Sequence, residues 1–193
     1  MAISKMNANT HRFAMRYCYR WLPSGGRKNL NDPKEDHRCF MCGQTREDSS
    51  HFLKCRNIIA ERSYKKMLEK IFGSLNKIEA PPIIRQSVML NLKAWRDGKP
   101  IEREICETQR RIGWGMMLHG RISKEVSRKL VPNESDEGAI NQKVAQLITA
   151  IIGAAKESWN TRCEAMAIEI GCSVAKNQKM RLLQRADELR TEI

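Results

Sequence analysis

The chain has 193 residues, 41% of them hydrophobic, which is long enough and apolar enough to build a core and excludes a wholly disordered tail. No run of about 18 apolar residues is present, so a transmembrane helix is not expected. The first twelve residues, MAISKMNANTHR, contain no apolar stretch, so no secretory signal is expected either.

The net charge of +13 is unevenly distributed along the chain. Residues 1–130 hold 27 lysines and arginines against 13 acidic residues, whereas residues 131–170 hold 3 against 6. A basic surface of this kind attracts a polyanion, so nucleic acid is the expected partner. The alternative is an ordinary soluble protein that happens to be basic.

A disordered start is expected over residues 1–9, followed by a helix over residues 10–22. Phe13, Tyr17 and Trp21 recur at helical spacing, which predicts that they belong to the core. A stripe of cations recurs about once per turn and continues beyond the helix, namely Arg12, Arg16, Arg20, Arg27 and Lys28. Aromatic side chains beside such a stripe would alternatively serve a phosphate backbone or a stacked base.

The strongest local pattern is a set of four metal ligands, Cys39, Cys42, His51 and Cys55. Three thiolates and an imidazole suit tetrahedral zinc, and a glycine at position 43 relieves the turn between the first pair. His51 and Cys55 are four positions apart, so both leave the first turn of a helix in one direction. Because all four positions are filled by protein, the Zn2+ is expected to be structural rather than catalytic.

Two alternatives to this site remain open. His37 is a rival ligand, and the four residues could instead be unrelated buried thiols and a surface histidine. The other cysteines, at positions 18, 106, 163 and 172, are scattered on apolar faces, which is typical of reduced thiols. We therefore expect an intracellular, reducing compartment, either nucleus or cytoplasm.

Helical periodicity continues through the rest of the chain. The helix that begins at His51 is expected to reach about Leu75. Further helices are expected from Pro82 to Gly98, over 102–118 with a break at Gly113, and over 121–130. The longest periodic run covers 139–170, and a last helix covers about 175–190. Because strand signals are almost absent, the fold class is predicted to be mainly α.

These elements suggest four segments: a disordered N-terminus (1–9), the basic helix with the zinc module and the following helix (10–75), a helical region (76–132), and the long helix with the C-terminal helix (133–193). The 139–170 helix has an acidic outer face, which disfavours nucleic acid there. It would instead serve a protein partner or self-association.

The segment from His11 to Cys55 resembles the zinc-binding segment that follows the polymerase in reverse transcriptases of non-LTR retroelements. The matching positions are Trp21, Leu22, Pro23, Cys39, Cys42, Gly43, Glu47, His51, Leu53 and Cys55. The segment from Gln109 to Val126 resembles a downstream part of such proteins. Trp159 and Arg162 resemble a late Trp-x-x-Arg-Asn element, although Cys163 replaces the asparagine. No Asp-Asp pair of a polymerase is present, so the resemblance implies nucleic-acid binding without synthesis.

The predicted function is therefore that of a zinc-stabilised nucleic-acid-binding protein, not an enzyme, that contacts mainly the backbone of RNA or DNA. The expected phosphate contacts are Arg12, Arg16, Arg20, Arg27, Lys28, Arg38, Lys54 and Arg56. Two other functions stay open. One is a structural or scaffold subunit of a ribonucleoprotein or another complex, and the other is a metal-dependent nuclease that uses Asp32, Asp36, Glu47 and Asp48.

Overall fold

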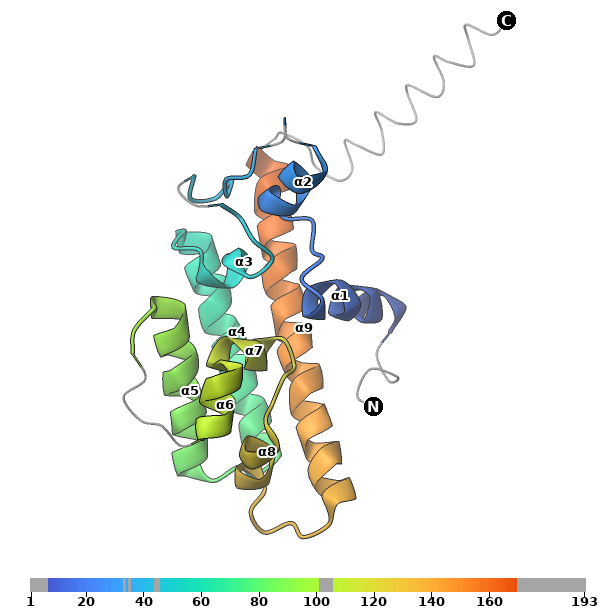
Figure 1. Cartoon of the computed structure of the whole chain (residues 1–193), viewed down its shortest axis with the longest axis vertical. Coiled ribbons are helices and arrows are strands. Elements are labelled where there is room, and N and C mark those ends of the chain that lie inside the picture. Colours follow the sequence, from blue (N-terminus) through green and yellow to red (C-terminus); the bar gives the residue numbers. More distant parts are fainter. Residues whose placement is uncertain (1–6, 33, 35, 44–45, 101–105, 170–193) are drawn as a thin grey trace, which may run out of the picture.

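The computed structural model describes residues 7–32, 34, 36–43, 46–100 and 106–169. The helices are α1 (Ala8–Cys18), α2 (Gly25–Asn31), α3 (His51–Lys54), α4 (Ile58–Lys77), α5 (Pro82–Asp97), α6 (Glu107–Ile112), α7 (Trp114–Leu118), α8 (Lys124–Leu130) and α9 (Glu137–Glu169) (Figure 1). Within these ranges the only β-type pairing is one isolated bridge, so the mainly α prediction is confirmed. No described helix has both the length and the apolar composition that crossing a bilayer requires.

The predicted long helix is α9, and most other elements pack on it. Its 33 residues span about 50 Å at 1.5 Å per residue. Its apolar residues form one broad buried arc, since α1, α3, α4, α7 and α8 all contact this helix. Figure 1 shows α4 running beside α9, with α1 and α5 on opposite sides of this pair. The helix expected near 175–190 lies outside the described residues.

Helix α1 departs from the prediction at both ends. It begins earlier, because Asn7 caps it by accepting a hydrogen bond from the Thr10 N–H, so residues 7–9 are ordered rather than disordered. It also ends earlier, at Cys18. Phe13 and Tyr17 are buried as expected, but the prediction for Trp21 was wrong: its side chain is 58% exposed.

The segment around the predicted metal ligands contains two features that the sequence did not reveal. A short helix, α2, forms in a segment for which the sequence predicted no helix. The helix that begins at His51 does not continue to Leu75: it ends at Lys54, and Asn57 caps a new helix, α4, by accepting from the Ile59 N–H. Ile58 and Ile59, at the start of α4, are exposed. The buried residues of this helix are Ala60, Tyr64, Met67, Leu68, Ile71 and Leu75.

Helix α5 agrees closely with its predicted ends, whereas α6 begins at Glu107 and α8 at Lys124, each later than expected. Helix α5 begins at Pro82 and is closed by Gly98 in the left-handed conformation. Gly113 separates α6 from α7, as predicted. The buried amide of Gln109 holds these turns together: its Nε2 donates to the carbonyls of Gly113 and Arg121, and its Oε1 accepts from the Ser123 N–H.

Candidate metal centre and basic surface

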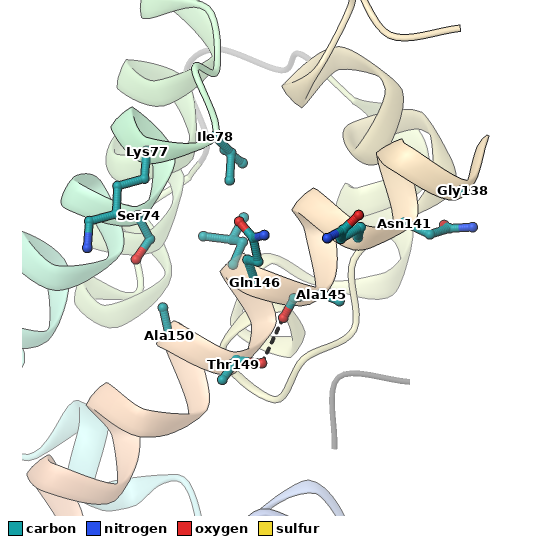
Figure 2. Close-up of a pocket in the computed structure, with 11 residues that line it drawn as sticks. Ser74, Lys77, Ile78, Gly138, Asn141, Ala145, Gln146, Thr149 and Ala150 are labelled. Carbon is teal, nitrogen blue, oxygen red and sulfur yellow. Dashed lines mark hydrogen bonds between the residues drawn. The ribbon is translucent and has the colours of Figure 1, made fainter. Parts of the chain in front are cut away.

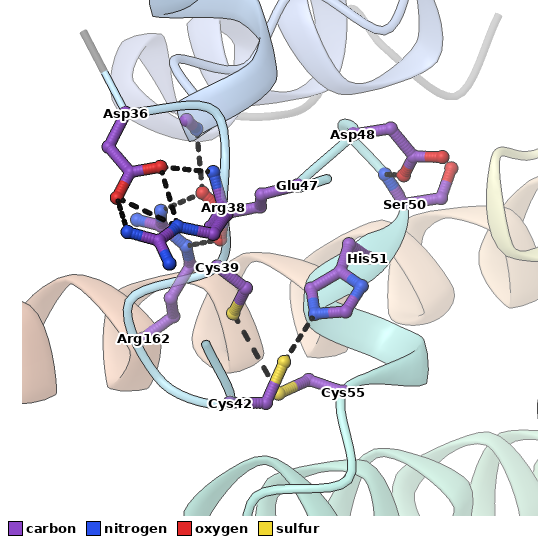
Figure 3. Close-up of polar contacts among 11 residues, drawn as sticks. Asp36, Arg38, Cys39, Cys42, Glu47, Asp48, Ser50, His51, Cys55 and Arg162 are labelled. Carbon is purple, nitrogen blue, oxygen red and sulfur yellow. Dashed lines mark hydrogen bonds and ion pairs between the residues drawn. The ribbon is translucent and has the colours of Figure 1, made fainter. Parts of the chain in front are cut away.

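Cys39, Cys42, His51 and Cys55 converge on one point (Figure 3). Their ligand atoms all lie within 4.8 Å of one another. The Sγ atoms of Cys39 and Cys55 are 3.9 Å apart, and the Cys42 Sγ is 3.4 Å from the His51 Nε2. A tetrahedral ion with bonds of about 2.3 Å to sulfur and 2.0 Å to nitrogen needs edges of about 3.8 and 3.5 Å, so these two separations match such an ion.

The first ligand pair sits on a tight turn inside a closed loop. The Gly43 N–H donates to the Cys39 carbonyl at 2.7 Å, and Gly43 has a φ of +69°, a conformation that glycine adopts without strain. An antiparallel bridge between Arg38 and Arg46 closes the loop. Gly43 therefore has the role that the sequence predicted. His37 is exposed and does not belong to the donor cluster.

The second ligand pair comes from α3, which also contributes to the hydrophobic core. His51 opens this helix and Cys55 caps its end, while Phe52 and Leu53 are buried. The Phe52 ring packs edge-on against Trp159 of α9, with centroids 5.4 Å apart. Helix α3 presents its ligands on one side and buries Phe52 and Leu53 in the core on the other. The packing of the core therefore fixes the position of these ligands.

Two polar side chains from other helices fix the ends of the ligand segment. Arg96 of α5 donates to the carbonyls of Leu53 and Cys55 at 3.1 and 2.9 Å, which satisfies groups that the end of α3 leaves unpaired. Asn57 donates to the Met41 carbonyl at 2.9 Å, which joins the Cys39–Cys42 turn to the start of α4.

A buried ion pair fastens the ligand loop to α9. The guanidinium of Arg162 contacts both carboxylate oxygens of Glu47, with Nε 2.6 Å from Oε1 (Figure 3). The side chains of Arg162 and Glu47 are only 5% and 2% exposed. Glu47 also accepts from the Gly25 N–H at 2.6 Å, and the Trp159 ring centroid lies 4.6 Å from the guanidinium carbon. Through these contacts Glu47 and Arg162 hold the ligand loop against α9.

The donors perturb one another's protonation. The hydrogen bond that Cys39 shares with Cys55, together with burial, raises the pKa of Cys39 to about 12, and the same bond lowers the pKa of Cys55. The Cys39 sulfur raises the pKa of His51 to about 9. A metal cation competes with protons for such ligands, so the cluster is expected to release protons when it binds an ion.

Comparison with known proteins gives no relative. No protein-family model, no curated protein and no solved structure matches this chain.

The predicted phosphate contacts lie in three places. Arg12 and Arg16 are exposed on α1, and Arg20 lies just beyond it with its Nη2 3.3 Å from the Met116 Sδ. Lys28 and Arg38 line a hollow of about 510 Å3 beside the ligand loop, together with Arg162. Lys54 and Arg56 face the end of α5: the first lies over the Trp95 ring and the second pairs with Asp97 at 3.0 Å. The side chain of Arg27 lies outside the described part.

The carboxylates considered for a nuclease do not form one cluster. Asp36 pairs with Arg38, Asp48 accepts from the Ser50 N–H, and Asp32 accepts from the Lys34 N–H. Glu47 is buried in its pair with Arg162. Among the described residues, the cysteine and histidine ligands are the single group close enough to hold an ion.

A second cavity lies between the end of α4 and the first half of α9 (Figure 2). It has a volume of about 610 Å3, and Ser74, Gln146 and Ala150 are among its lining residues. Lys77 is the one ionisable side chain in its described lining. The groove therefore offers no pair of acidic and basic groups for proton transfer.

Sequence reasoning did not identify Arg96, Asn57 or the pairing of Glu47 with Arg162. Glu47 and Arg162 were both among the positions that match reverse transcriptases, and this resemblance was the one indication in the sequence that they matter. Each was marked in a separate segment, because nothing in the spacing indicates that residues 115 positions apart are in contact.

Proposed function

We propose that this protein is a zinc-stabilised nucleic-acid-binding protein. The observation that carries the proposal is the charge around the ligand segment. Among the described side chains of residues 7–56, exposed carboxylates number three and exposed cations nine: Arg12, Arg16, Arg20, Lys28, Lys34, Arg38, Arg46, Lys54 and Arg56. Such an excess of exposed positive charge within one segment of the chain favours a phosphate backbone as the partner.

Zinc is the proposed ion because of the chemistry of the donors. Three sulfurs and one imidazole nitrogen form a soft set that suits Zn2+ and disfavours Mg2+ or Ca2+, which prefer oxygen. With four protein ligands there is no open position for water, so the ion would stabilise the fold rather than react. Elemental analysis of the purified protein should find about one zinc per chain, and Cys42→Ser should lose it. Full zinc in that variant would contradict the ligand assignment.

The proposed mode of binding is contact with the backbone. Arginines and lysines on α1 and around the ligand loop would neutralise phosphates and release counterions, so affinity should fall steeply with salt and depend weakly on sequence. The test is a salt titration of zinc-loaded protein against labelled single-stranded RNA, single-stranded DNA and duplex DNA.

A matched pair of double variants makes this test specific. Arg12→Ala with Arg16→Ala removes two exposed charges from α1, and Lys93→Ala with Lys124→Ala removes two exposed charges from α5 and α8. The first should weaken binding and reduce the salt slope by roughly one for each phosphate that the protein no longer neutralises. The second should change both much less. If the two double variants weaken binding equally, only the net charge of the protein matters. If the unaltered protein binds none of the three polymers at low salt, the proposal is overturned.

The likeness to retroelement reverse transcriptases is part of the proposal. It gains support from the buried contact of Glu47 with Arg162, since both positions belong to segments that the likeness marks independently. The remaining segment of the likeness begins at Gln109, which is also fully buried and hydrogen-bonds to the backbone of the turns that follow it. We infer a protein derived from, or forming part of, the C-terminal region of such an enzyme, acting inside the cell.

A scaffold role for the 139–170 helix has less support. The partner would dock on the acidic outer face of this helix. The apolar residues Val144, Ile152 and Ala155 are buried within the chain, so they offer a partner no apolar surface. Sedimentation of the protein over a range of concentrations tests this role, which predicts a stable dimer or larger assembly.

A further inference from the structure

Two aromatic side chains stand exposed where α1 ends. Tyr19 and Trp21 are each 58% exposed, and their ring centroids are 5.5 Å apart with planes inclined by 33°. The rings therefore contact each other and still offer much of their surface to solvent. Large aromatic side chains are ordinarily driven into the core by the area they can bury, so an exposed pair requires a reason.

The backbone holds this pair in a fixed turn. The N–H groups of Arg20 and Trp21 donate to the carbonyls of Tyr17 and Arg16, which closes the end of α1. Arg20, between the two aromatics, has a φ of +58°. This position at a helix end is usually glycine, because a side chain there is strained. Tyr17 before the turn and Leu22 after it are fully buried, so the turn is anchored on both sides.

Three arginines lie close to the exposed rings along the chain. Arg16 is on the last turn of α1, Arg12 is one turn earlier, and Arg20 is within the turn itself. All three arginines are exposed. The contact of Arg20 with the Met116 sulfur also places its guanidinium.

No other aromatic pair in the described residues has this character. The remaining ring contacts, Phe13 with Tyr17, Tyr17 with Phe52 or His119, and Phe52 with Trp159, join side chains that are buried. Phe72 is 42% exposed, but no ring contact pairs it with another aromatic. The pair at the end of α1 is therefore a local feature and not a general property of this surface.

We propose that Tyr19 and Trp21 form a stacking platform for the bases of single-stranded nucleic acid, with phosphates on Arg12, Arg16 and Arg20. This inference rests on the proposed function and narrows it to one class of polymer. Unpaired bases can stack on exposed rings whatever their identity, whereas the bases of a duplex are already stacked within it. A platform beside cations is what such binding requires.

The experiment compares zinc-loaded variants of the full chain on labelled oligouridine, oligothymidine and a duplex with the same number of phosphates. Tyr19→Ala and Trp21→Ala should each weaken single-strand binding by roughly 5- to 100-fold, and should change duplex binding by less than about 2-fold. Tyr19→Phe and Trp21→Phe keep a ring and should retain most of the affinity. Ile83→Ala, which removes an equally exposed apolar side chain from α5, should have no effect.

Tryptophan fluorescence gives a second readout. Trp114 and Trp159 are buried and Trp95 is half-buried, so stacking should quench mainly Trp21, and the quenching should disappear in Trp21→Phe. Single-strand affinity that is unchanged in both alanine variants would overturn the platform and leave the proposed function standing. Failure of the unaltered protein to bind any polymer at low salt would overturn both.

Discussion

The guanidinium of Arg162 lies against both carboxylate oxygens of Glu47, which precedes it by 115 positions in the chain. Glu47 follows the ligand pair Cys39–Cys42, and Arg162 is near the end of α9, so this contact links the ligand loop to the longest helix. Both side chains are buried, which makes the pair sensitive to the loss of either partner.

We predict that Arg162→Met lowers the free energy of unfolding of the zinc-loaded protein by about 3–5 kcal/mol, because it leaves a buried carboxylate unpaired. Urea unfolding measures this. The control is Lys70→Ala, which removes an exposed pair with Glu157 and should cost less than about 1 kcal/mol. Equal effects of the two variants would show that the Glu47–Arg162 pair adds no more than a surface contact. Adding Glu47→Leu to Arg162→Met should recover part of the loss.

Removal of the metal should unfold the ligand segment and leave most of the helical core folded. Cys39, Cys55 and Ala60 form a small cluster of their own, whereas Tyr64, Met67, Ile71 and Leu75 belong to the main core. We therefore expect residues 36–43 and 54–57 to lose hydrogen-exchange protection in chelator. Phe52 and Leu53, which belong to the main core, and α4 beyond Ala60 should keep it. One continuous helix from His51 to Leu75, as the sequence predicted, would instead extend the unfolding to Leu75. Loss of protection along all of α4 and α9 would favour that wider unfolding.

Acidification should destabilise the protein through His119. This side chain is 3% exposed, stacks on Tyr17, and has its Nδ1 3.3 Å from the Tyr17 carbonyl, and burial lowers its pKa to about 4. The unfolded chain takes up this proton near pH 6.5 and the folded chain only near pH 4, so stability is lost as the pH falls through that interval. From pH 7 to pH 5 the loss from His119 should be about 2 kcal/mol.

The measurement for His119 is urea unfolding at both pH values in excess zinc, for the unaltered protein and for His119→Gln. The variant has no proton to take up at this position, so its stability should depend less on pH by the predicted amount. Identical pH dependence in the two proteins would assign the acid sensitivity to other groups, the metal ligands among them.

Gly115 is expected to tolerate no side chain. A Cβ at this position would lie 2.1 Å from the Trp95 Nε1, inside the indole ring that packs on the glycine. Gly115→Ala should therefore destabilise the protein by about 1–3 kcal/mol or more through overpacking. Gly153→Ala in α9 is the matched control. Apart from the adjacent backbone of α9 itself, no atom lies within 4 Å of the added Cβ, so this change should be neutral or stabilise the helix by up to about 1 kcal/mol. Thermal unfolding of both variants distinguishes these outcomes.

The sequence predicted those parts of the fold whose signals are local. Helix α5 has both of its ends marked, by Pro82 and by Gly98, and the four metal ligands identify themselves by spacing. The periodicity of α9 was equally clear. In each case the residues that determine the feature lie within a few positions of one another, or repeat regularly.

The sequence failed where tertiary contacts decide. Trp21 continues the helical spacing of Phe13 and Tyr17, but the helix ends at Cys18. The chain then turns through the left-handed conformation of Arg20, a position where the sequence has no glycine to indicate a turn. Glu47 appears beside other carboxylates as part of a surface cluster, yet it is buried because Arg162 and the Gly25 N–H satisfy it. Charge alone did not distinguish a solvated carboxylate from one with a distant partner.

The separation of Glu47 from Arg162 also has a consequence for synthesis. At roughly 5–20 residues per second, a ribosome needs about 6–23 s to add the residues between them. Once Cys55 has been added, early in that interval, all four metal ligands are present, while the guanidinium that anchors their loop does not yet exist. An ion bound early would thus organise the loop first, and α9 would later dock onto a loop whose carboxylate is already in position.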